Sequence, residues 1–116
     1  MKVKRLLMAS TATLMFLLPW GAAQAFECPK HFAAAQAAID KITGDMGGDM
    51  SKQMPKEQMA LVHALLDEAK MILVGAKHNH EKPQGMYDHG RAIAKADTAH
   101  SLAHAADIFH FKLMQM

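Results

Sequence analysis

Histidine and aspartate residues alternate on one face of the last predicted helix. Asp97, His100, His104 and Asp107 follow one another at steps of three, four and three residues, which places them on one side of an α-helix. Two imidazoles four residues apart form a common helical pair of metal ligands. The carboxylates could add oxygen ligands or fix the tautomers of the imidazoles. This quartet is therefore the principal predicted metal site.

A second pair on the preceding predicted helix could complete that site. His63 and Asp67 are four residues apart and are therefore neighbours on one helix face. They would close a four-ligand site only if the helices are rotated so that they face His100 and His104. The alternative without a metal is a hydrogen-bonded helix surface, because such pairs stabilise a helix by about 0.3 kcal/mol each.

Two weaker groups also carry metal-ligand chemistry. Met46, Met50 and Met54 recur every four residues in a glycine-containing linker, and thioether sulfur favours soft ions such as Cu(I). Flexible methionines covering a hydrophobic core are the alternative for this linker. Cys28 and His31 form a C-x-x-H pair that could chelate zinc or copper, although a thiol without a metal is equally compatible with the pattern.

Several other function classes lack their motifs. The chain has no C-x-x-C-H haem attachment sequence, and its long helices lack the Glu-x-x-His pattern of di-iron bundles. Glycine-rich phosphate loops and basic patches interleaved with aromatic residues are also absent. We therefore expect a non-enzymatic protein without a nucleic-acid partner.

The elements that must position these residues are predicted to be helices. We expect a short helix over residues 31–43 with Pro29 near its first turn, a second over 55–77, and a third that starts between 85 and 89 and ends near 114. Residues 78–85 would be an exposed connection. Such a short link makes the last two helices antiparallel neighbours. The predicted fold is an all-α, up-down helical bundle with two long antiparallel helices and a short N-terminal helix.

Each predicted helix has an apolar face. The faces consist of Phe32, Ala35, Ile39 and Ile42; of Val62, Leu65, Leu66, Ala69, Ile72, Leu73 and Ala76; and of Ala92, Ala96, Ala99, Ala103 and Ala106. Small alanines allow another helix to approach closely. The histidine and aspartate stripe, which begins at His89, lies about a quarter turn from the alanine face.

The first 25 residues have the pattern of a secretory signal peptide. Lys2, Lys4 and Arg5 precede an apolar run over 6–18, and residues 23–25 read Ala-Gln-Ala, a typical cleavage pattern. The run is shorter than the roughly 20 residues of a membrane-spanning helix. We therefore expect a signal peptide over 1–25, a single exported domain over 26–116 in the periplasm or outside the cell, and no membrane association after cleavage.

The composition after residue 25 agrees with a metal-handling role. All eight histidines follow the predicted cleavage point, and so do most of the 11 methionines. The chain has 1 cysteine, so an internal disulfide is impossible. A domain this small often gains stability from a bound metal or from self-association.

Two functions follow from these features. The first is sequestration or delivery of a transition metal. Histidine favours copper, zinc and nickel, and the methionines favour copper among these. The alternative is a helical interaction or stress protein whose histidine and aspartate stripe forms a homodimer seam. Its assembly would respond to pH between about 5 and 7, where histidine titrates.

Overall fold

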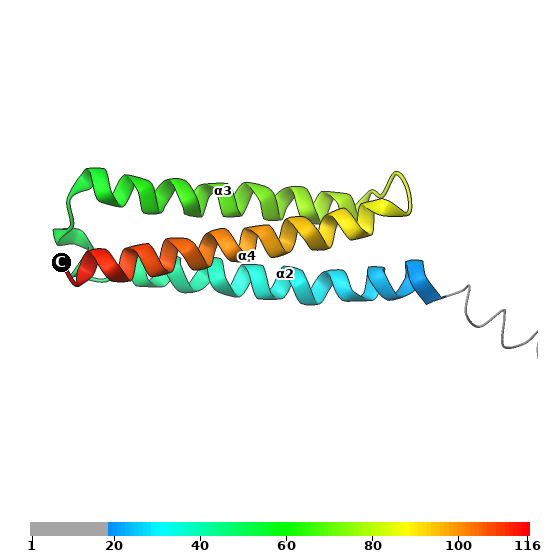
Figure 1. Ribbon diagram of the computed structural model, residues 1–116, viewed down its shortest axis with the longest axis horizontal. Helices are drawn as coiled ribbons and strands as arrows, with labels where there is room; N and C mark the ends of the chain where they lie inside the picture. Colours follow the sequence, from blue (N-terminus) through cyan, green and yellow to red (C-terminus); the bar gives the residue numbers. More distant parts are fainter. Residues whose placement is uncertain (1–18) are drawn as a thin grey trace, which may run out of the picture.

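Three long helices, each antiparallel to the one before it, make up the described part of the chain. The computed structural model describes the backbone of residues 19–116, with side chains from Glu27 onward. Helix α2 spans Pro19–Met46, α3 spans Lys56–Glu81 and α4 spans Tyr87–Met114, while a short 3-10 helix, η1, spans Ser51–Gln53 (Figure 1). The predicted all-α helical bundle is confirmed. Within the described residues, none of the helices is both long and apolar enough to cross a membrane.

The first helix is much longer than predicted. It begins at Pro19 instead of near His31, so Pro29 lies inside it. Proline removes one backbone hydrogen bond there, but the alanines, glutamine and glutamate around it favour helix and outweigh this local cost. Cleavage after Ala25 would return Pro29 to the first turn, where its missing N–H costs nothing. Residues 1–18 of the predicted signal peptide lie outside the described residues.

The core consists of three apolar seams with alternating steps of three and four residues. Their fully or almost fully buried members are Ala35, Ile39 and Ile42 on α2; Val62, Leu66, Ala69, Leu73 and Ala76 on α3; and Ala92, Ala96, Ala99, Ala103 and Ala106 on α4. This spacing is typical of helices that pack along one another at a small crossing angle. The predicted apolar faces are therefore the ones that form the core.

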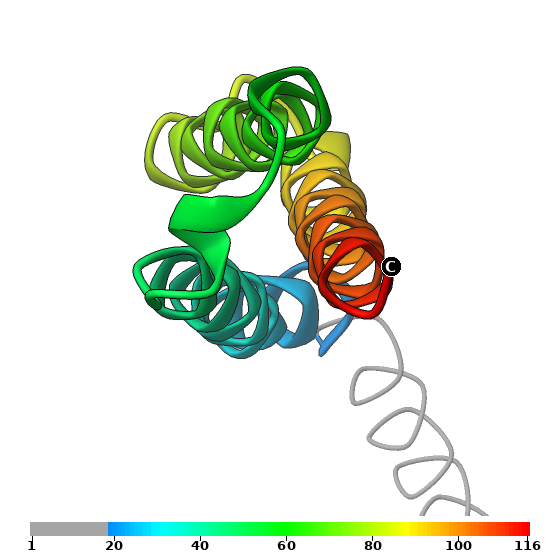
Figure 2. The same cartoon turned by 90° about the vertical axis from the view of Figure 1, so that its left-hand side faces the viewer.

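Helix α4 is the central element of the bundle. Viewed along the bundle axis, the three helices occupy the corners of a triangle (Figure 2). Helix α4 contacts both α2 and α3 more extensively than these contact each other. Its five seam alanines are fully buried, so both neighbours approach its backbone closely. A larger residue at Ala99 would overpack this seam at a cost of about 1–3 kcal/mol.

Polar side chains fix the two connections between helices. In the α2–α3 connection, the Ser51 hydroxyl lies 3.1 Å from the carbonyl oxygen of Asp45 and 2.7 Å from His110 Nε2 on α4. In the α3–α4 connection, Asp88 accepts a hydrogen bond from the backbone N–H of Gln84 at 2.5 Å. Ser51 thereby links the α2–α3 connection to α4, and Asp88 links the α3–α4 connection to the first turn of α4.

Candidate metal centre

One group of metal-ligand side chains comes together at the α3–α4 end of the bundle. Cys28 from α2, His80 from α3 and His89 from α4 each present one ligand atom, and these atoms lie within 4.8 Å of one another. Cys28 is fully buried, and both histidines are partly buried. In residues 27–116, no other three histidine, cysteine or carboxylate side chains meet this closely. Each helix therefore supplies one side chain to a common point.

The three residues occupy seam positions at the end of the core. Cys28 lies seven residues before Ala35, His80 lies four after Ala76, and His89 lies three before Ala92. The steps of three and four residues that direct alanine, leucine and isoleucine inward therefore direct these side chains inward as well. The packing of the bundle positions the group without any special loop.

Both imidazoles have a buried nitrogen without a hydrogen-bond partner. The Nδ1 atoms of His80 and His89 are shielded from solvent and make no hydrogen bond. A buried polar atom left in this state costs about 1–3 kcal/mol. Ring contacts hold the imidazoles: the edge of Phe32 meets His80 at 5.5 Å between centroids, and His80 meets His89 at 5.4 Å. The site is thus ordered by packing while both of these Nδ1 atoms remain without a hydrogen bond.

The Cys28 thiol is kept protonated by its surroundings. Its Sγ donates to the backbone carbonyl of His89 at 3.5 Å. Burial raises the pKa of the thiol above its ordinary value of 9.0, and a backbone hydrogen bond opposes this shift only in part. A metal ion that binds sulfur would have to displace this proton.

The donor set fits a transition-metal ion. A thiolate and two neutral imidazoles are ligands for zinc and copper. With metal–sulfur and metal–nitrogen distances of about 2.3 and 2.0 Å, donors around a three-coordinate ion lie roughly 3.5–3.7 Å apart. Donor atoms within 4.8 Å of one another therefore need to close by about 1.3 Å at most. Side-chain rotation alone can supply such a change.

The principal predicted quartet lies elsewhere, on the outer face of α4. His100 and His104 are exposed, and neither belongs to the converging group. Asp97 Oδ1 lies 2.6 Å from His31 Nδ1, and Asp107 Oδ2 forms an ion pair with Lys41 Nζ at 2.6 Å. The two carboxylates of the quartet are thus engaged with α2. The quartet as a metal site stays a prediction.

The pair predicted to complete the quartet also points to solvent. His63 and Asp67 are exposed on α3. No hydrogen bond or ion pair joins either residue to His100 or His104. A shared site of these residues is therefore not assembled within this one copy of the described chain.

Lys41 bridges two carboxylates on the surface of the bundle. It contacts Asp45 at 2.8 Å and Asp107 at 2.6 Å, and these hydrogen bonds, Asp107 first, raise the pKa of Lys41 to about 12. The hydrogen bond from Lys41 in turn lowers the pKa of Asp45. Asp107 is thus held in an ion pair with lysine, which competes with any role as a metal ligand.

The two weaker predicted groups are separated by the structure. Cys28 joins the converging group, whereas His31 turns towards Asp97 and has Glu27 Oε2 at 3.7 Å from its Nε2. The predicted methionines divide similarly. Met46 ends α2 and packs against the core, Met54 is half-buried after η1, and Met50 is 65% exposed. The C-x-x-H spacing therefore identifies one of the converging residues but not its partners.

His80 and His89 were missed for two different reasons. Residues 78–85 were predicted to be an exposed connection, but α3 continues to Glu81, so His80 is helical and half-buried. His89 fits two spacings, four residues before Ile93 on the polar stripe and three before Ala92 on the alanine seam. The seam spacing is the signal that could have found both, since each histidine continues it by one step.

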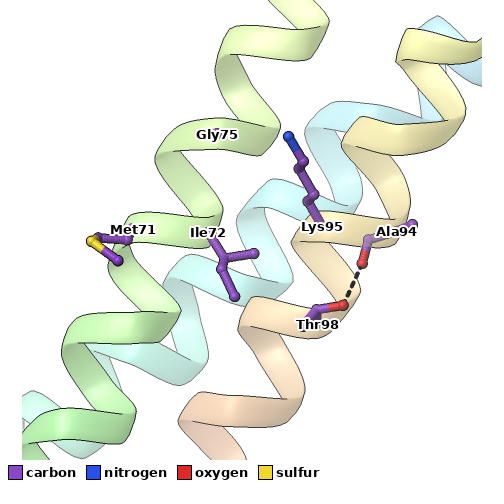
Figure 3. A pocket seen from close by; sticks show the side chains of 6 residues that line it. All are labelled: Met71, Ile72, Gly75, Ala94, Lys95 and Thr98. Carbon is purple, nitrogen blue, oxygen red and sulfur yellow. Dashed lines mark hydrogen bonds between the residues drawn. The ribbon is translucent and has the colours of Figure 1, made fainter.

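A groove between α3 and α4 offers no comparable chemistry. Figure 3 shows its lining, which consists of Met71, Ile72, Gly75, Ala94, Lys95 and Thr98 around a volume of about 450 Å³. The amine of Lys95 passes beside Gly75 and donates to Asn79 Oδ1 at 2.6 Å. Thr98 donates to the carbonyl of Ala94 at 2.8 Å. The two polar side chains that line the groove, Lys95 and Thr98, are therefore already hydrogen-bonded within the protein.

Comparison with known proteins gives no relative from which a function could be transferred. No protein-family model matches the chain, and neither the curated proteins nor the solved structures contain a match. Function must therefore be inferred from the chemistry of the site.

Proposed function

We propose that this protein binds a transition-metal ion through Cys28, His80 and His89 and serves to sequester or deliver it. The observation that carries the proposal is the convergence of a thiol and two imidazoles from three helices, together with two buried, unpartnered Nδ1 atoms. A cluster kept only for stability would satisfy its buried polar atoms or replace them by apolar groups. Copper is the first candidate, and zinc or nickel comes next.

The number of donors suits transfer better than a permanent structural role. Structural zinc sites use four protein ligands, whereas sites with an open position use three. This group offers three, so an ion bound here keeps a position at which a ligand of another molecule can attack. The predicted signal peptide would place such exchange outside the cytoplasm, where an exported carrier could collect or pass on metal.

Metal titration of the purified chain tests the proposal. Calorimetry with Cu²⁺, Zn²⁺ and Ni²⁺ in two buffers of different ionisation enthalpy reports stoichiometry and proton release together. We expect about one tightly bound ion per chain, with protons released from the thiol. Cys28→Ser and His89→Ala should each weaken binding by more than the roughly 10–100-fold that loss of a supporting residue costs.

The matched control is a histidine that lies outside the group. His104→Ala should leave the affinity unchanged, because His104 is exposed on α4. If His104→Ala lost metal binding and Cys28→Ser kept it, the metal would bind at the predicted quartet that includes His104. Absence of heat and of proton release with all three ions would contradict metal binding itself.

A second function is favoured by the outer face of α4. His100, His104, Ile108 and Phe111 follow one another at steps of four, four and three residues, and Ile108 and Phe111 are 44% and 56% exposed. We propose this face as the alternative homodimer seam, with assembly sensitive to pH through the two histidines. Native mass spectrometry at pH 5 and pH 7 tests it, and a monomer at both values contradicts it.

A further inference from the structure

The converging group carries little charge of its own. A thiolate contributes one negative charge, and two neutral imidazoles contribute none. The group of ligand atoms within 4.8 Å includes no carboxylate. A monovalent ion would therefore give a neutral complex, whereas a divalent ion would leave one positive charge uncompensated.

Three carboxylates adjoin these residues in sequence, and two of them are engaged elsewhere. Asp88, next to His89, is 7% exposed, accepts the N–H of Gln84 and lies 3.7 Å from Arg91 Nη1. Glu27, next to Cys28, has its carboxylate 3.7 Å from His31 Nε2. Glu81, next to His80, is exposed. None of these three carboxylates belongs to the group, so none supplies a ligand charge to an ion there.

The burial of the group makes this charge balance matter. Cys28 is fully buried, His80 and His89 are half-buried, and Phe32 packs against the ring of His80 in a T-shaped contact. Excess charge in such surroundings is poorly solvated and therefore unfavourable unless it is paired. A divalent ion could recover part of this cost by binding hydroxide or another anion, which needs a fourth position open to solvent.

We infer that the centre is a Cu(I) site with three protein ligands, the Cys28 thiolate and the imidazoles of His80 and His89, and that it prefers Cu(I) to Zn²⁺. This inference rests on the proposed function and names the ion it handles. The thiolate is a soft ligand suited to Cu(I), and three donors complete a trigonal complex of this ion without water. Zinc in proteins almost always takes four ligands.

Competition with chromophoric chelators tests the preference on the full chain. Cu(I), maintained by ascorbate, is titrated against a bathocuproine chelator, and Zn²⁺ is titrated against a zinc-binding dye. We expect Cu(I) to bind at least about a thousandfold more tightly than Zn²⁺, a difference in Kd of three decades. X-ray absorption at the copper edge should show one sulfur and two nitrogen ligands.

A variant that changes the charge of the donor set sharpens the test. His80→Asp replaces a neutral ligand by an anionic one, so that the set matches a divalent ion. We expect the ratio of Cu(I) to Zn²⁺ affinity to fall by at least roughly a hundredfold. His100→Ala is the control and should leave this ratio unchanged. Circular dichroism of each variant confirms that the helices remain folded.

The outcomes separate the inference from the proposed function. Zinc binding as tight as Cu(I) binding, lost in Cys28→Ser, would overturn the Cu(I) preference and leave the metal-binding function in place. Binding of neither ion would overturn both. Cu(I) binding that survives Cys28→Ser and His89→Ala would place the copper elsewhere and overturn the site. An unchanged affinity ratio in a folded His80→Asp protein would overturn the charge argument.

Discussion

Histidines with a buried ring nitrogen lie at both ends of the bundle, and they differ in whether that nitrogen has a hydrogen-bond partner. At the α2–α3 connection, His110 is 1% exposed and its Nε2 lies 2.7 Å from the Ser51 hydroxyl. Because Ser51 can donate its proton to the carbonyl of Asp45, His110 would donate from Nε2. At the opposite end, His80 and His89 each bury an Nδ1 atom without a partner. Figure 1 shows the α2–α3 connection at the left end of the bundle and the α3–α4 connection at the right end.

This difference distinguishes a structural histidine from one available to a ligand. A buried imidazole nitrogen that is hydrogen-bonded stabilises one arrangement of the chain and is not itself available to an ion. An imidazole with an unpartnered nitrogen costs stability until something binds there. Histidine can therefore be a structural residue at one end of the bundle and a potential ligand at the other. Four predictions separate these purposes, and the largest effect comes first.

Metal loading should stabilise the protein more than any single substitution. A ligand present at 1,000 times its Kd adds about 4 kcal/mol to the free energy of unfolding. Urea unfolding followed by circular dichroism, with copper under reducing conditions and with a chelator, measures this difference. Cys28→Ser should abolish the gain. If Cys28→Ser kept this gain in unfolding free energy, the metal would not be binding through Cys28, and the proposed difference between the two ends would be contradicted.

Loss of the serine partner should damage the satisfied end. Ser51→Ala leaves the Nε2 atom of His110 buried without a partner, which should cost about 1–3 kcal/mol of unfolding free energy. Metal affinity should not change, because Ser51 lies at the opposite end of the bundle. Ser101→Ala, at an exposed position on α4, is the control for the loss of a hydroxyl. A weaker metal affinity in Ser51→Ala would show that the two ends are coupled.

An apolar replacement should have the opposite effect at the unsatisfied end. His89→Leu removes a buried nitrogen without a partner, so the metal-free protein should gain about 1 kcal/mol. The same variant should lose the stabilisation by metal. Chemical unfolding of the variant with and without metal measures both effects. A large loss of stability in the metal-free variant would mean that His89 is a structural residue.

High pH should weaken the metal-free protein through the thiol. Burial raises the pKa of Cys28 above 9.0, so the folded state favours the protonated thiol more than the unfolded state does. This contribution is complete below pH 9.0 and is lost as the pH rises through the raised pKa of the folded state. Unfolding between pH 7 and 11 should therefore show a steeper loss for the natural chain than for Cys28→Ala. Parallel curves would contradict a buried, protonated thiol.

Much of the fold was predictable because apolar spacing and packing use the same geometry. The alanine face of α4 from Ala92 to Ala106 and the leucine face of α3 were recognised from steps of three and four residues, and these faces form the core. The length of α2 was not predictable in the same way, because proline is typical of the first turn of a helix, whereas the neighbours of Pro29 favour helix strongly enough for α2 to continue past it.

The candidate site was less accessible from the sequence. Cys28 was a secondary candidate, whereas His80 and His89 were outside the predicted ligand set. A histidine at a seam position looks the same in sequence whether it binds an ion, accepts a hydrogen bond or reaches solvent. His110 and His89 both continue the alanine seam of α4, and only the neighbouring helix and connection decide that one meets serine and the other meets a thiol.

The alanine seam of α4 also sets a rule for insertions and deletions. His89 and His110 stand 21 residues apart, three full heptads, so both face the core from the same side. One residue added or removed between them would rotate one end by about 100° and turn one histidine out of the core. A whole heptad would preserve both orientations to within about 20° while lengthening the helix by about 10 Å. Related chains that keep both histidines should therefore vary the length of this helix in steps of seven residues, with matching changes in α2 and α3.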